Sequence, residues 1–402
     1  MKDGESKSVL IRDARIVQPE GVASGKSLFV EAGRIARIAE ESNQLRAEIT
    51  KNFAGLTLYP GFVDMHIHGA DGVDTMQATA ADLRRVAKFL VTAGVTAWVP
   101  TLVPAPDIDY RRAVTAIEEA MLGQAKQQGD ARILGVHYEG PFVNSAQCGA
   151  LRTAYFKPFS KSTDIDDLPT PRDSSTVRMM TLAPEIDGGI RLVRELKERG
   201  WIPALGHTRA GIDVLDEAFA AGACHMTHFM NAMAPLHHRA PGPIAWGLIK
   251  DEVTCDIIAD GIHLDPFVLR LLLRKKGPNR LALISDAIAA AGKGDGEYMI
   301  WGESIQVKEG RTRNAKGIIA GSVITMVEAV RMMLSVGASE SEVAWMASTN
   351  PARLLAIDND CGSIEEGKRA DLVGLDSKGN VRLTMVGGTI VFDDESRGSA
   401  DQ

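Results

Sequence analysis

Five side chains that follow strand-like runs are the residues of this 402-residue sequence best suited to chemistry. His66 and His68 end an apolar run in PGFVDMHIHG, and residues two apart on a strand point to the same face. Single histidines follow two later runs, His207 in LGHT and His228 in THFMN. Glu139 ends a fourth run, GVHYE. Imidazole and carboxylate groups are typical zinc ligands, so the pattern predicts a metal site in which Glu139, His207 and His228 leave one position open for water.

An aspartate completes the set, because Asp286 follows the last apolar run, LALIS. In that place it would accept a proton from a metal-activated water. The alternatives are unrelated surface histidines, a salt-bridged Glu139 and an Asp286 that caps a helix. His137 precedes Glu139 by two positions, and we interpret it as a core or supporting histidine rather than a ligand. His225 is given a structural role.

Short β-rich runs alternate with helical segments through the middle of the chain. The runs cover residues 95–100, 133–138, 179–183, 202–205, 224–227, 254–258 and 281–284, and the helical segments include 81–92, 110–128, 190–199 and 268–275. With one more strand before His66 the count is about eight, which favours an α/β fold of the (β/α)8 TIM-barrel type over an open, doubly wound sheet. Residues 164–175 are polar and are predicted to form a surface loop.

Both chain ends carry short-strand patterns. Residues 27–38 alternate around Ala32-Gly33, a hairpin signal, and residues 371–375 and 381–392 predict further strands. Neither end is apolar enough to be stable alone. We therefore expect one small composite β-sandwich domain from residues 1–59 and 356–402, beside a metal-dependent hydrolase barrel over residues 60–355.

Composition excludes several classes of protein. The formal net charge is −7 and no dense basic run occurs, which argues against a nucleic-acid partner. No apolar stretch reaches the roughly 20 residues of a membrane span, and the polar N-terminus lacks the pattern of a signal peptide. The four cysteines lie far apart, which favours free thiols and a cytoplasmic location. The sequence also lacks GxGxxG and P-loop motifs.

The full set of motifs resembles the N-acetylglucosamine-6-phosphate deacetylase family of the amidohydrolase superfamily. The resemblance covers nearly the whole chain and rests on PGFVDMHIHG, HYEGPF, LGHT, THFMNAM, HHRAPG, ADGIHLD, SDAIAAAG and the AGS of residues 320–322. It implies a deacetylase of amino-sugar catabolism with one or two divalent metal ions per subunit, zinc first and iron or cobalt as alternatives. It also implies that Glu139, His207 and His228 hold the principal metal, that His66 and His68 hold a second one, and that Asp286 is the catalytic acid and base.

The resemblance further implies a set of substrate-binding residues: Ala150, Leu151, Asn231, Ala232, Arg239, His263, Ile319, Ala320 and Gly321. Arg239 matches an arginine that reaches the phosphate bound by the neighbouring subunit, which predicts a homodimer. Leu151 stands where the family usually has a histidine that contacts the acyl carbonyl. Beside Arg239, His237 and His238 would either add donors to the phosphate or belong to a solvated loop.

Three other functions stay open at this point. The first is deacetylation of another small-molecule amino-sugar phosphate, such as N-acetylgalactosamine-6-phosphate. The second is hydrolysis of a different amide or cyclic amide that carries no phosphate. The third is a non-catalytic sugar-phosphate-binding protein, for which Leu151 is the only support in the sequence.

Overall fold

Eight parallel strands form the barrel in this computed structural model, which describes residues 7–40, 45–126 and 129–394. In order around the sheet they are β6 (Phe62–Ile67), β9 (Val95–Leu102), β11 (Gly135–Glu139), β12 (Val177–Leu182), β13 (Ile202–Leu205), β14 (His225–Met226), β15 (Thr254–Ile258) and β16 (Leu281–Ile284). A short strand, β10 (Arg132–Ile133), also pairs with β9. The predicted barrel is confirmed, and its side chains at the carboxyl ends of the strands share one rim.

Backbone hydrogen bonds join the first barrel strand to the segment that follows the last one. The Asp286 N–H donates to the His66 carbonyl at 2.9 Å, and the His68 N–H donates to the Ala287 carbonyl at 2.8 Å. These hydrogen bonds between the first strand and the segment after the last one hold Asp286, the predicted catalytic aspartate, directly beside His66 and His68.

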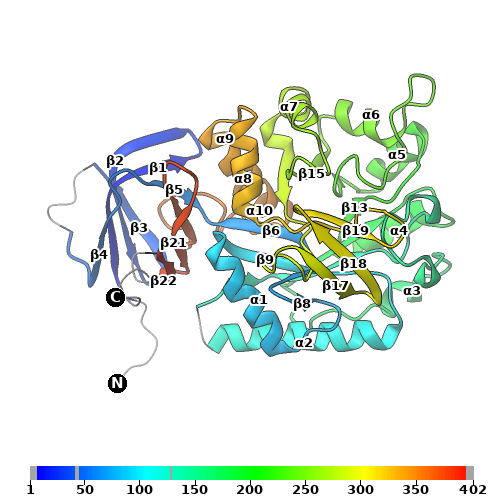
Figure 1. Cartoon of the computed structure of the whole chain (residues 1–402), viewed down its shortest axis with the longest axis horizontal. Helices are drawn as coiled ribbons and strands as arrows, with labels where there is room; N and C mark the ends of the chain where they lie inside the picture. The colour runs from blue at the N-terminus through cyan, green and yellow to red at the C-terminus, as the bar shows by residue number, and fades with distance from the viewer. Residues whose placement is uncertain (1–6, 41–44, 127–128, 395–402) are drawn as a thin grey trace.

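Helices surround the barrel (Figure 1). They are α1 (Ala80–Thr92), α2 (Asp107–Lys126), α4 (Gly189–Glu198), α5 (Ile212–Ala220), α6 (Gly242–Ile249), α7 (Pro266–Lys275), α8 (Met326–Ser335), α9 (Glu340–Ala344) and α10 (Asn350–Leu354). The four helices predicted from the sequence correspond to α1, α2, α4 and α7, and residues 127–128 of the second lie outside the described residues. Helix α1 shows the local cause: Thr79 and Asp82 form a capping box, while Leu83, Val86 and Leu90 bury one face.

Both ends of the chain contribute to one eight-stranded sheet, which lies to one side of the barrel (Figure 1). Its strands are β1 (Val9–Gln18), β2 (Gly21–Glu31), β3 (Arg34–Ala39), β4 (Ile49–Asn52), β5 (Thr57–Pro60), β20 (Leu372–Leu375), β21 (Val381–Val386) and β22 (Thr389–Asp393). The decisive pairing is antiparallel, between β5 and β20, with Pro60 opposite Leu372. The hairpin at Ala32-Gly33 is as expected, with both residues at positive φ.

This composite sheet has a hydrophobic core of its own, which includes Ile11, Leu28 and Phe53 from the N-terminal part and Leu372 and Met385 from the C-terminal part. The domain limits 1–59, 60–355 and 356–402 stay a prediction, and residues 1–6, 41–44 and 395–402 of the composite domain lie outside the described residues. Within the described part of the chain, no helix is both long and apolar enough to cross a membrane.

Two local features differ from the sequence-based expectation. Residues 164–175 are not loop throughout, because the short helix α3 (Thr163–Asp166) occupies their start, with Ile165 buried against the barrel. A three-stranded sheet also follows β16, made of β17 (Gly296–Ile300), β18 (Glu303–Lys308) and β19 (Arg311–Asn314). This sheet was not among the predicted elements, and it carries Trp301 to the mouth of the barrel.

Candidate active site

Three predicted ligands converge at the carboxyl ends of β11, β13 and β14. The Glu139 Oε1 atom lies 2.8 Å from His207 Nε2 and 2.9 Å from His228 Nε2, and the two nitrogens are 3.1 Å apart. All three side chains are buried. In a tetrahedral zinc site with bonds of about 2.0–2.1 Å, neighbouring ligand atoms lie about 3.3 Å apart, close to these separations.

The HxH pair belongs to the same cluster. His66 Nε2 lies 3.3 Å from His68 Nε2, and His68 Nε2 lies 3.3 Å from Glu139 Oε2. Glu139 thus presents one oxygen to His207 and His228 and its other oxygen to His68. Two groups of three residues therefore have the geometry to hold a metal ion, and Glu139 belongs to both. One group contains His66 and His68, and the other contains His207 and His228.

The tautomer of His207 indicates whether Glu139, His207 and His228 suit a bound cation. His207 Nδ1 lies 2.8 Å from the Gln147 carbonyl, which can only accept, so Nδ1 carries the proton. In the neutral ring with this tautomer, the lone pair on Nε2 points at the Glu139 carboxylate and at His228. A positive ion among these atoms would remove the repulsion between that lone pair and the carboxylate. A histidine ring whose other nitrogen donates to a backbone carbonyl is also typical of metal ligands.

Asp286 lies beside the HxH pair, two residues beyond the end of β16. Its Oδ1 atom is 3.1 Å from His68 Nε2 and 3.4 Å from His66 Nε2, and this buried oxygen has no hydrogen-bond partner among the described residues. An oxygen held in this way is available to a water or a substrate proton.

The backbone is strained at three of these positions. His207, His228 and Asp286 have φ values of 49°, 31° and 48°, a region that residues other than glycine rarely adopt. Such conformations cost of order 1–3 kcal/mol each and persist where surrounding structure holds them, commonly at functional sites. At His228 that support includes Asp256, whose carboxylate accepts the His228 backbone N–H.

The two remaining buried histidines have structural partners, as interpreted from the sequence. His225 Nε2 lies 2.9 Å from Asp256 Oδ2, so His225 orients the carboxylate that supports His228. His137 Nε2 lies 2.8 Å from Thr181 Oγ1, and burial lowers the pKa of His137 to about 3, which keeps its ring neutral.

A cavity of about 220 Å³ opens over the cluster. Seven of the nine predicted substrate-binding residues line it: Ala150, Leu151, Asn231, Ala232, His263, Ile319 and Gly321. Ala320 is instead fully buried, and Arg239 is exposed on the loop before α6, outside this cavity. Sequence reasoning missed Trp301, whose ring centroid lies 5.1 Å from that of His68. The sequence pattern that could have revealed it is the turn at Ile300-Trp301-Gly302, which lies between two runs of alternating residues and is typical of a hairpin.

Comparison with known proteins agrees with this geometry. Residues 57–391 match the model of the amidohydrolase family. The chain belongs to that family. It is 34% identical to an N-acetylglucosamine-6-phosphate deacetylase of Bacillus subtilis (strain 168) over 96% of this chain and 98% of the relative. An N-acetylgalactosamine-6-phosphate deacetylase of Escherichia coli O157:H7 is also 34% identical, over 95% of this chain and 98% of the relative.

A solved structure extends the agreement to three dimensions. The N-acetylglucosamine-6-phosphate deacetylase of Thermotoga maritima superposes with a TM-score of 0.86 at 32% sequence identity, covering 96% of this chain and 99% of that chain. Within the amidohydrolases, the chain therefore belongs to the N-acetylglucosamine-6-phosphate deacetylases, and the resemblance drawn from the motifs is confirmed.

A buried pair below the site predicts an effect on stability. The Ser285 hydroxyl donates to Asp64 Oδ2 at 2.5 Å, and the Ser285 backbone N–H donates to Asp64 Oδ1 at 3.2 Å. Burial raises the pKa of Asp64 to about 7, against the effect of these bonds. Ser285→Ala should therefore lower the free energy of unfolding by about 1–3 kcal/mol in urea titrations. The exposed Ser335→Ala is the control and should change it by less than about 0.5 kcal/mol.

Proposed function

We propose that this protein hydrolyses the N-acetyl group of N-acetylglucosamine-6-phosphate to glucosamine-6-phosphate and acetate, in amino-sugar catabolism. The observation that carries the proposal is the convergence of Glu139, His207 and His228 within 3.1 Å of one another, with the buried Asp286 oxygen beside them in one cavity. The family of the chain and the names of its relatives supply the substrate class.

The residues divide the work of amide hydrolysis. Glu139, His207 and His228 would hold a divalent cation, which supplies Lewis acidity that acidifies water and polarises a carbonyl. Asp286 accepts a proton from the attacking water as the new C–O bond forms. It then returns a proton to the amine nitrogen as the C–N bond breaks, so no covalent enzyme intermediate is required. Leu151 lines the cavity but cannot donate a hydrogen bond to the acyl oxygen, and a cation held by the histidine cluster would supply that polarisation in its place.

The substrate's phosphate needs a cation that the cavity itself does not contain. Among the described residues, those that line the cavity include neither lysine nor arginine. Arg239 is exposed on the loop before α6, and the planar fork of an arginine suits phosphate. We therefore propose a homodimer in which each subunit supplies Arg239 to its neighbour's site. The exposed His237 and His238 flank this arginine.

An acetate-release assay on four sugars tests the substrate. Metal-loaded protein should release acetate from N-acetylglucosamine-6-phosphate with a kcat/KM at least tenfold above that for N-acetylgalactosamine-6-phosphate, and far above those for either sugar without phosphate. A preference for the galacto sugar would reassign the substrate, because a relative of that specificity is equally similar. Equal rates without phosphate would favour another amide, and no release at all would favour a non-catalytic binding protein.

Metal content tests the role of the HxH pair. We expect two ions per chain in metal-replete protein, and one in His66→Gln or His68→Gln, because Glu139, His207 and His228 form a complete site without them. His238→Gln, on the exposed loop, is the control and should keep both ions. Elemental analysis and competition with a chelator give the content. One ion in the wild-type protein would contradict the second site and leave the first intact.

Zinc is the metal we propose, with iron or cobalt as alternatives, since His and Glu ligand sets accept several divalent ions. A cytoplasmic location is proposed on the chemistry of the cysteines. All four (Cys148, Cys224, Cys255 and Cys361) are free thiols, as is usual in a reducing compartment.

A further inference from the structure

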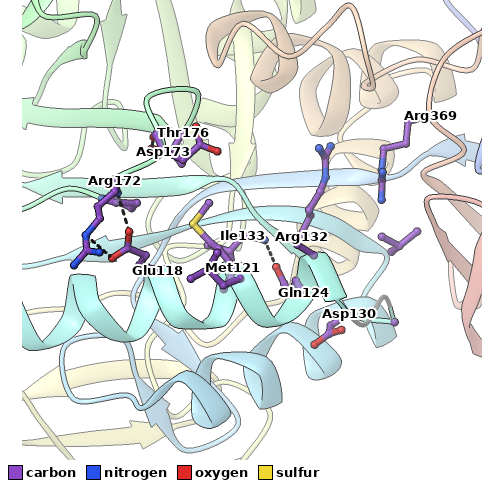
Figure 2. A pocket seen from close by; sticks show the side chains of 15 residues that line it. Glu118, Met121, Gln124, Asp130, Arg132, Ile133, Arg172, Asp173, Thr176 and Arg369 are labelled. Atoms are coloured by element: carbon purple, nitrogen blue, oxygen red, sulfur yellow. Dashed lines mark hydrogen bonds and ion pairs between the residues drawn. The ribbon is translucent and has the colours of Figure 1, made fainter. Parts of the chain in front are cut away.

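A second cavity, of about 500 Å³, is shown in Figure 2. It lies at the end of the barrel where the strands begin, whereas the histidine cluster lies at their carboxyl ends. Its walls are α2, residues 129–133 before β11, residues 171–176 before β12, and Arg369 and Val386 from the C-terminal part of the chain. These barrel segments precede their strands, whereas Glu139 ends β11. Glu139 lies seven positions after Arg132, roughly 23 Å of extended chain. The cavity is therefore separate from the proposed active site.

Part of this cavity is apolar and held in place. Met121, Ile133 and Val386 line it, and apolar atoms form most of its surface. The Gln124 side chain donates to the Ala131 carbonyl at 2.8 Å and accepts the Ile133 N–H at 3.0 Å, which fixes α2 against β10. The cavity therefore offers a preformed surface to the carbon skeleton of a ligand.

Two arginines reach this space from different parts of the chain, as Figure 2 shows. Arg132 lies 3.7 Å from the nearest Asp360 oxygen and 3.6 Å from the nearest Asp371 oxygen, too far for hydrogen bonds. Its only side-chain hydrogen bond among the described residues is a weak one to Cys361 Sγ, and its buried Nε has no partner. Arg369 donates through Nε alone, to both Asp371 oxygens. Most of the guanidinium donors thus make no hydrogen bond within the described part of the chain, although both groups lie at ion-pair distance from Asp371.

The positive charges of the arginines in this region outnumber the carboxylates that pair with them. Three guanidinium groups, those of Arg34, Arg132 and Arg369, share the two carboxylates of Asp360 and Asp371, because Arg34 lies 3.0 Å from Asp360. One positive charge is left over in this group.

The other acidic groups of the cavity wall have partners of their own. Asp130 is paired with Arg84 at 2.9 Å, and Glu118 accepts the Arg172 backbone N–H at 3.1 Å. Asp173 accepts hydrogen bonds from the backbone and hydroxyl of Ser175 and keeps its negative charge, but no ion pair joins it to Arg132 or Arg369 among the described residues.

We propose that this cavity is a binding site for a small organic anion, whose carboxylate or phosphate group lies between Arg132 and Arg369 and whose carbon skeleton lies against Met121, Ile133 and Val386. A guanidinium fork matches both kinds of oxyanion, and unsatisfied buried donors are commonly completed by a ligand or ion. Because Arg132 belongs to the barrel and Arg369 to the segment that leads into β20, the anion bridges the two.

Calorimetric titration of the metal-loaded protein with three probes tests the site. Benzoate supplies an oxyanion on a ring, inorganic phosphate supplies an oxyanion alone, and benzamide is the neutral counterpart of benzoate. Benzoate should bind at least tenfold more tightly than either of the other two. Arg132→Gln and Arg369→Gln should each weaken benzoate at least tenfold. Arg172→Gln removes the same charge from the exposed rim of the cavity and should leave the affinity within twofold.

The outcomes separate this site from the metal centre. Benzoate bound at the histidine cluster would keep its affinity in all three variants, and that result overturns the proposal. Benzamide as tight as benzoate overturns it too, and phosphate as tight as benzoate overturns the role of the apolar surface. Arg132→Lys keeps the charge without the fork and should lie between wild type and Arg132→Gln. If Arg132→Gln does not fold, Arg369→Gln carries the test, with acetate release at the wild-type rate as the check on folding.

Discussion

Asp286→Asn should lower kcat for N-acetylglucosamine-6-phosphate by at least about 10³-fold while the metal content stays unchanged. General acid–base catalysis typically contributes about 10²–10⁴, and here one carboxylate serves both the attacking water and the departing amine. Asparagine has nearly the same size but cannot take up a proton. The ligands Glu139, His207 and His228 are not altered, so the metal should remain.

The control for this variant is Asp213→Asn, which makes the same change on the exposed first turn of α5. It should turn over at the wild-type rate. Acetate release and elemental analysis on the same preparations provide both readouts. Turnover near the wild-type rate in Asp286→Asn, with metal bound, would show that another group moves the proton.

Arg239→Ala should raise KM for the phosphorylated sugar by about 10–100-fold, since a charge-assisted pair with phosphate contributes roughly 1.5–3 kcal/mol. Hydrolysis of the sugar without phosphate should change by less than about twofold. Arg111→Ala, which removes one positive charge from the exposed face of α2, is the control and should leave both KM values unchanged.

Mixed dimers test whether Arg239 binds the phosphate in its own subunit's active site or in that of its neighbour. Subunits with Arg239→Ala and subunits with Asp286→Asn are each nearly inactive at low substrate. In a mixed dimer, one site combines an intact Asp286 with the partner's Arg239, so activity should return toward half of that of wild type. Verified mixed dimers without any recovery would place Arg239 in its own subunit's site or away from the phosphate.

Much of the barrel could be predicted because its strands are short apolar runs, and polar residues follow the end of each run. Strands β13, β15 and β16 begin and end at the predicted residues. The candidate metal-binding group followed from the same pattern, because each proposed ligand lies at or within two residues of a strand end. The parallel arrangement then brings ends that are far apart in the sequence to one rim.

The elements that escaped prediction lack that apolar signal. In β18 only the alternate residues Ile305 and Val307 are buried, so the β17–β19 sheet lacks the continuous apolar run that marks the barrel strands. Arg132 and Arg369 were not recognised either, because a cavity between segments 237 residues apart has no local pattern. Arg239 was assigned to the phosphate only through the family resemblance, because a partner on another chain leaves no local pattern in the sequence.

The pairing of β5 with β20 has a consequence for synthesis on the ribosome. About 310 residues separate the end of β5 from the start of β20, so at about 5–20 residues per second the wait is roughly 15–60 s. During that time one edge of β5, between Thr57 and Pro60, has no strand to pair with and is open to other chains. Stop codons or proteolysis before Leu372 should therefore yield an aggregating product rather than a free barrel.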